Sequence, residues 1–200
     1  DSDEFIAMSE AAGAEGTDNG LTFIGARYRM PDQSVYGILH QRTPDLFETT
    51  FAKLEKRVEF TGESSLWADI SYTAQRSVGE ARIGDFSTHL ISARLEYITG
   101  PQKFRLGMSR TDEGGGIKKP YGNPANYLSI IINDFDRAGE DAVTAGYSLD
   151  MGQVGPGRLS FFANLVWGDT PDTGPIASPD ANEFDLTVDW RLNQGWSEKV

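Results

Sequence analysis

Basic side chains recur at alternate positions along this 200-residue chain, in stretches whose apolar residues also alternate. Arginine offers a planar set of donors that matches a carboxylate, so such positions can bind anionic groups. Inside a closed, water-filled sheet with low-dielectric walls, a row of them would attract carboxylate solutes. The candidate residues of this solute path are Arg27, Arg29, Arg42, Lys53, Arg57, Arg94, Arg105 and Arg191.

A second interpretation of the same positions remains open. Acidic residues share the faces that carry the basic ones, as Glu55, Glu96 and Asp185 show. A solvated sheet face with paired charges would give the same pattern, because such pairs are common on protein surfaces.

No enzyme signature is present, and we expect the protein not to be an enzyme. The chain has no G-x-S-x-G motif, no H-x-x-x-H pair and no phosphate-binding loop. We interpret its two histidines, His40 and His89, as structural or surface residues. Residues 134–139 match the start of a calcium loop, but Ala138 and Ala145 stand where further ligands belong, so we expect neither a metal nor another cofactor.

Composition narrows the class of protein. The net charge of -12 argues against nucleic acid as a partner, and the absence of cysteine excludes disulfides and thiolate sites. No apolar run approaches the roughly 18 residues of a membrane helix, although a membrane β-barrel needs none. The chain starts without signal-peptide features and stops in an unfinished strand pattern, so we interpret it as an internal fragment.

Alternation of period two predicts an all-β fold. It is clearest at residues 65–76, where Leu66, Ile70 and Tyr72 share one face and Asp69 lies on the other. A short helix competes only at residues 53–60, and we predict a strand there as well. The ten expected strands are approximately 4–9, 21–30, 33–42, 46–60, 65–76, 88–99, 103–111, 143–150, 160–167 and 184–191.

The connections alternate in length: every second one is short, and all the long ones fall in the other set. In an up-and-down antiparallel sheet this places tight turns at one end and long loops at the other, as in outer-membrane barrels. The longest loop, residues 112–141, has an apolar middle that must pack against something. Its run Ile130–Ile132 predicts inward packing, because each exposed isoleucine would forgo about 1.5 to 3 kcal/mol of burial.

Several segments together resemble the OprD family of outer-membrane porins. They are residues 20–28 (GLTFIGARY), 43–46 (TPDL), 75–79 (QRSVG), 86–90 (FSTHL), 120–124 (PYGNP) and 133–140 (NDFDRAGE). The resemblance covers nearly the whole chain and implies strands seven to sixteen of an eighteen-stranded antiparallel up-and-down transmembrane β-barrel. Residues 1–200 would form a single partial barrel domain, with 112–141 as an inward-folded constriction loop.

The resemblance also implies a function and a location. We expect an integral protein of the Gram-negative outer membrane that passes small, often carboxylate-bearing solutes such as amino acids and organic acids by passive diffusion. Expected partners are outer-membrane lipid, lipopolysaccharide and small anionic or zwitterionic solutes, with a monomeric full-length barrel. The expected constriction-loop residues are Tyr121, Asn123, Tyr127, Asp134 and Asp136. The alternative, from the strand pattern alone, is a soluble β-barrel or sandwich that binds a small ligand.

Overall fold

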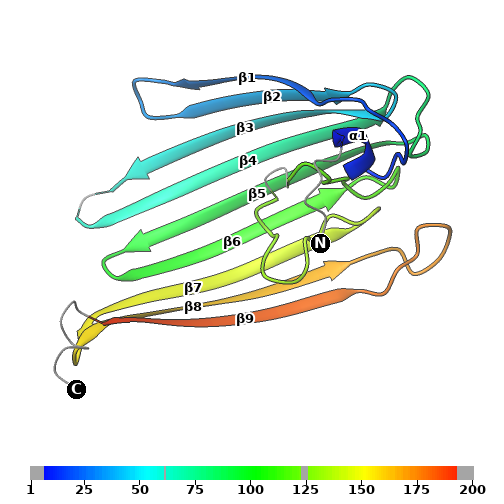
Figure 1. Ribbon diagram of the computed structural model, residues 1–200. Helices are drawn as coiled ribbons and strands as arrows, with labels where there is room; N and C mark the ends of the chain where they lie inside the picture. Colours follow the sequence, from blue (N-terminus) through cyan, green and yellow to red (C-terminus); the bar gives the residue numbers. More distant parts are fainter. Residues whose placement is uncertain (1–6, 61, 123–125, 193–200) are drawn as a thin grey trace.

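The computed structural model of the chain describes residues 7–60, 62–122 and 126–192. Within these ranges nine strands form one antiparallel sheet, and each strand pairs with its neighbour in sequence (Figure 1). The elements are α1 (Met8–Ala11), β1 (Thr22–Arg29), β2 (Val35–Thr43), β3 (Phe47–Glu59), β4 (Ser64–Ser77), β5 (Ser87–Thr99), β6 (Gln102–Thr111), β7 (Asp141–Val154), β8 (Gly157–Asp169) and β9 (Ala181–Leu192).

The two faces of the sheet have opposite character, as the alternation predicts. On β4, Tyr72 is 45% exposed on one face, whereas its neighbour Thr73 on the other face is only 1% exposed. The same apolar face continues across the sheet, because Tyr72 pairs with Ile91 and Ile70 pairs with Ala93. A broad apolar surface that faces outward, with polar residues covered on the inside, is the arrangement of a membrane barrel wall.

The connections sort to the two ends of the sheet. Short turns join β1 to β2, β3 to β4, β5 to β6 and β7 to β8 at one end, on the left of Figure 1. The opposite end holds α1, the 78–86 and 170–180 loops and the longest connection, residues 112–140. This confirms the expected asymmetry, in which the long loops gather at one end of the sheet.

The prediction of a strand at 4–9 is wrong in the part that can be described. Residues 4–6 lie outside the described ranges, and Met8–Ala11 form a helical turn. The backbone N–H of Ser9 donates to the carbonyl of Asn19 at 3.0 Å, so the segment folds back on itself and does not pair with β1. At 53–60, the strand prediction is confirmed by β3.

The strands are long enough to cross a membrane core. The longest, β4 and β7, have 14 residues each. At about 3.3 Å per residue and a tilt of about 40°, such a strand rises about 35 Å, more than the roughly 25 Å of the apolar band of a barrel. In the described part of the chain, no helix is both long and apolar enough to span a membrane.

Candidate functional site

The described parts of the long loop, residues 112–122 and 126–140, lie against the polar face of the sheet. The first limb of the loop, residues 112–122, is held by Gln75 of β4. The side-chain amide of Gln75 donates to the carbonyl of Lys118 and accepts from the Lys118 N–H, both at 2.8 Å. The Thr88 hydroxyl of β5 donates to the carbonyl of Gly115 at 2.5 Å. The loop therefore follows the inner surface and does not extend away from the barrel.

The middle of the loop is organised by Asn126. Its Oδ1 accepts hydrogen bonds from the hydroxyl of Ser92 on β5 and from the N–H of Leu128, both at 3.2 Å. Its Nδ2 donates to the carbonyls of Asp134 and Phe135 at 2.6 and 3.0 Å. One buried amide thus joins both limbs of the loop to the sheet.

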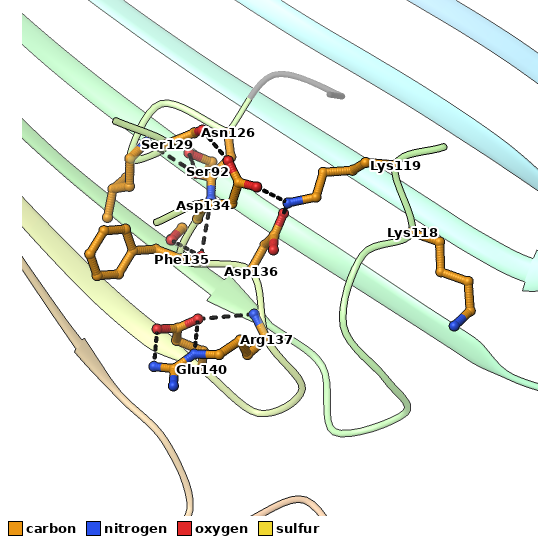
Figure 2. Close-up of polar contacts among 12 residues, drawn as sticks. Ser92, Lys118, Lys119, Asn126, Ser129, Asp134, Phe135, Asp136, Arg137 and Glu140 are labelled. Carbon is orange, nitrogen blue, oxygen red and sulfur yellow. Dashed lines mark hydrogen bonds and ion pairs between the residues drawn. The ribbon is translucent and has the colours of Figure 1, made fainter. Parts of the chain in front are cut away.

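An ion-pair cluster ties the two limbs together (Figure 2). The ammonium of Lys119 lies 2.6 Å from Oδ2 of Asp134 and 2.5 Å from Oδ2 of Asp136. Burial acts to raise the pKa of Asp134, but hydrogen bonds from Lys119 and Ser129 outweigh it and hold that pKa below its usual value. The carboxyl of Asp136 is more deeply buried, and burial raises its pKa despite the same lysine.

The second limb of the loop, residues 133–140, is fixed by Arg137 and Glu140. The guanidinium of Arg137 donates to Oε1 of Glu140 at 2.6 Å, and Glu140 is fully buried. The same guanidinium donates to the hydroxyl of Ser178 at 3.0 Å and to the carbonyl of Pro179 at 2.6 Å. Arg137 therefore joins the long loop to the β8–β9 loop.

The apolar packing of the loop differs from the expectation for its isoleucines. Leu128 and Phe135 are buried and pack with Val166 of β8. Ile131 and Ile132 are 70% and 79% exposed, so the prediction that the whole Ile130–Ile132 run packs inward is wrong. Glu183 of β9 accepts from the Ile132 N–H at 2.8 Å, so the sheet holds this run through its backbone and not through burial of these two side chains.

A pocket of about 390 Å³ lies between the middle of the loop and the sheet. Two guanidinium groups line it. Arg94 donates to Asp69 at 3.0 and 2.6 Å and lies 4.7 Å from the ring centre of Tyr127. Arg105 donates to Glu96 at 2.8 Å. Further lining residues are Asn126, Ser129, Ile130, Ile131, Phe162, Asn164 and Asp185.

The amino-acid sequence behind this arrangement, a polar inner face with a long loop folded across it, matches one known family. Residues 1–199 match the sequence model of the outer membrane porin, OprD family. The chain belongs to the OprD family. No curated protein sequence matches it.

Solved structures from Pseudomonas aeruginosa agree with this OprD-family fold. OccK5 (OpdH) is 18% identical with a TM-score of 0.76, over 90% of this chain and 50% of that one. OccK10 (OpdN) is 19% identical with a TM-score of 0.78, over 90% and 56%. OpdK with vanillate is 19% identical with a TM-score of 0.67, over 88% and 53%. The chain therefore spans about half the length of these porins, and its place is the outer membrane.

Seven of the eight predicted path residues of this OprD chain lie on the polar face, and one does not. Arg42 pairs directly with Glu48, which pairs with Arg76, and it shares its face with Ile38. Its assignment to the lumen is wrong, because residues of the same parity on β2 point outward. The residues on the polar face are Arg27, Arg29, Lys53, Arg57, Arg94, Arg105 and Arg191.

The predicted constriction-loop residues do not all lie together. Tyr127, Asp134 and Asp136 lie in the part of the loop that covers the sheet. Tyr121 is elsewhere: its ring stacks on Phe47 at 5.9 Å. Asn123 lies outside the described residues.

Acidic partners accompany the basic residues of the polar face. Lys53 lies 2.8 Å from Glu55, and Lys103 lies 3.4 Å from Glu96. Such pairs are compatible with a solute path as well as with a solvated sheet face. Sequence reasoning missed Gln75, Asn126, Lys119 and Asn164, and no local signal marks them, since each acts through a partner distant in the chain or on another strand.

Proposed function

We propose that the protein containing this chain is a passive channel that selects small carboxylate-bearing solutes, such as amino acids and organic acids, without a chemical step. The observation that carries the proposal is the pocket under the long loop, with Arg94 and Arg105 in its wall. Loop residues 112–140 narrow the path there, and the two guanidinium groups meet the solute.

The arginines keep donors for a solute. A guanidinium has five N–H groups, and Arg94 uses Nε and one terminal nitrogen on Asp69. The partner carboxylates of Asp69 and Glu96 compete with an incoming carboxylate, which keeps binding weak. Weak binding, with a Kd on the order of mM, suits a channel because the solute must leave again.

Asp185 favours zwitterions among these solutes. It lines the same pocket, where its carboxyl group lies beside that of Glu183 and the backbone N–H of Ile131. A solute ammonium group would be attracted to these neighbouring acidic groups while the solute carboxylate contacts the arginines. The apolar side chains of Ile130 and Phe162 in the same wall accommodate a hydrocarbon part.

Liposome swelling with the full-length porin tests this function. We expect Arg94→Gln to slow the entry of an α-amino acid and of a monocarboxylate about fivefold relative to the corresponding neutral amide, since an exposed ionic contact contributes about 1 kcal/mol. Asp185→Asn should slow the amino acid and not the monocarboxylate. Arg76→Gln, on the outer face, is the matched control. Equal slowing of all three solutes would contradict carboxylate selection.

A further inference from the structure

A second pocket lies on the polar face of the sheet, between the pocket under the long loop and the end that carries the short turns. It measures about 490 Å³, and Gly100 and Pro101 of the β5–β6 turn line its far side. Phe162 lines both pockets, so the two adjoin along the sheet. A solute that leaves the arginines toward the short turns therefore enters this second pocket.

The strand register places the second pocket one row of residues beyond the first. Lys103 and Arg105 are two positions apart on β6, as are Thr187 and Asp185 on β9. Two residues of a strand span about 6.6 Å, so a solute only a few carbon atoms long can contact both rows at once. The row that lines the second pocket, given as direct partners across the sheet, is Ile98, Lys103, Ser148, Phe162 and Thr187.

Three hydroxyl groups in this pocket are available to a ligand. They belong to Ser148, Ser160 and Thr187, and none of them is hydrogen-bonded to another residue in the part of the chain that the structure describes. Each hydroxyl can donate one hydrogen bond and accept two. Asp189 adds an acceptor, because Arg191 donates to its Oδ2 at 2.7 Å and leaves Oδ1 for a ligand.

The second pocket has less positive charge than the first. Among its described lining residues the one basic side chain is that of Lys103. The ammonium of Lys103 lies 3.4 Å from Glu96, whose other carboxylate oxygen accepts from Arg105 at 2.8 Å. Glu96 thus offsets part of the charge of both basic groups. The second pocket is therefore suited to neutral polar groups, whereas the first is suited to a carboxylate.

We propose that the second pocket binds the hydroxylated part of polyhydroxylated carboxylates, a class that includes the six-carbon acid gluconate. The solute carboxylate contacts the arginines of the first pocket. Its hydroxyl groups exchange hydrogen bonds with Ser148, Ser160 and Thr187. Its C–H groups lie on the ring of Phe162, which joins the two pockets. The inference rests on the proposed carboxylate channel and narrows its substrate class.

An apolar chain of the same length fits this pocket less well. It would displace the water that hydrates the three hydroxyls without replacing the hydrogen bonds of that water, which loses affinity. Gluconate and hexanoate are a matched pair for this difference, since both have six carbon atoms and one carboxylate and only gluconate has hydroxyls. Glucitol is the third probe, because it has the hydroxyls without the carboxylate.

Block of the single-channel ion current of the full-length porin by these three solutes tests the proposal. We expect gluconate to reach half-block at the lowest concentration. In the variant with Ser148→Ala, Ser160→Ala and Thr187→Val, the half-blocking concentration should rise at least about tenfold for gluconate and stay within about twofold for hexanoate, since each neutral hydrogen bond contributes about threefold. Ser87→Ala, an exposed serine on the opposite face of the sheet, is the matched control and should change neither value.

Arg94→Gln separates this inference from the function on which it rests. It should weaken block by gluconate and hexanoate equally and leave glucitol unchanged. Gluconate that blocks no better than hexanoate, or that is insensitive to loss of the three hydroxyls, would overturn the inference and leave carboxylate selection intact. Equal block by gluconate and glucitol in the wild type would contradict carboxylate selection, and the inference would be overturned with it.

Discussion

Gln75 of β4 and Lys118 of the long loop are joined by two hydrogen bonds of 2.8 Å, one in each direction between a side-chain amide and a backbone peptide. The carbonyl and the N–H of one loop residue are therefore both satisfied by one strand residue. Since the two residues are 43 positions apart, this contact fixes the first limb of the loop to the barrel wall.

Replacement of Gln75 should release that limb. In Gln75→Ala the Lys118 peptide loses both partners, and a covered polar group left without partners costs about 1 to 3 kcal/mol. We expect hydrogen exchange at the Lys118 amide to become at least fivefold faster. Gln153→Ala, which removes a side-chain contact in the β7–β8 turn, is the control. Exchange at Lys118 that matches the wild type would show that the amide pair does not hold the loop.

The neighbouring lysines 118 and 119 should differ strongly in their effect on the loop. Lys119→Met leaves two carboxylates without their shared cation. The side chain of Asp136 is 9% exposed and that of Asp134 is 45% exposed, so the buried pair with Asp136 accounts for most of the loss, up to about 3 to 5 kcal/mol. Lys118→Met removes only a contact of its ammonium with the ring of Phe86, which is 4.7 Å away. Such a contact contributes about 0.5 to 1 kcal/mol.

Protease cleavage of the loop in the folded porin measures this difference. We expect Lys119→Met to increase the cleavage rate within residues 112–140 by at least tenfold over Lys118→Met. Similar rates in the two variants would mean that the cluster around Lys119 does not tie the limbs together.

The two aspartates of the cluster should respond to pH with opposite sign. Docking lowers the pKa of Asp134, so its contribution is present above the usual pKa and is lost as pH falls through the lowered value. Docking raises the pKa of Asp136, so its contribution is present below the usual pKa and is lost as pH rises through the raised value. At pH 7, Asp134→Asn should therefore weaken docking more than Asp136→Asn does.

Hydrogen exchange of the loop amides, compared between the two variants at pH 7, checks this order. The wild type should also lose protection as the pH falls below the usual pKa of an aspartate, and Asp134→Asn should lose less. A larger effect of Asp136→Asn at pH 7 would contradict the assigned roles.

The strands and their faces could be predicted because alternation on β4 has one clear phase. On β2 it does not: Leu39 faces the polar side while Ile38 faces outward, so apolar residues occur on both faces. The sequence therefore left the direction of Arg42 undetermined, and its lumen assignment failed. Alternation with a period of two predicts which side chains point inward only where one face of the strand is consistently polar.

The presence of a long, folded loop was predictable from its length and apolar middle, but its contacts were not. Ile132 is held through its backbone N–H, which Glu183, 51 positions away, accepts, and its side chain stays exposed. The helical turn at Met8–Ala11 depends likewise on a return contact between Ser9 and Asn19. Such contacts depend on how segments distant in the chain come together in the fold, which local sequence patterns do not encode.

The central claim is that loop 112–140 narrows the solute path on the polar face. Deletion of residues 122–132 removes the middle of the loop but keeps Lys119, Asp134 and the wall strands, whose hydrogen bonds run between neighbouring strands. Single-channel recording of the full-length porin, wild type against deletion, tests the claim most directly. We predict higher conductance and weaker discrimination between anionic and neutral solutes in the deletion variant. Conductance and selectivity equal to the wild type would contradict it and place the loop outside the path.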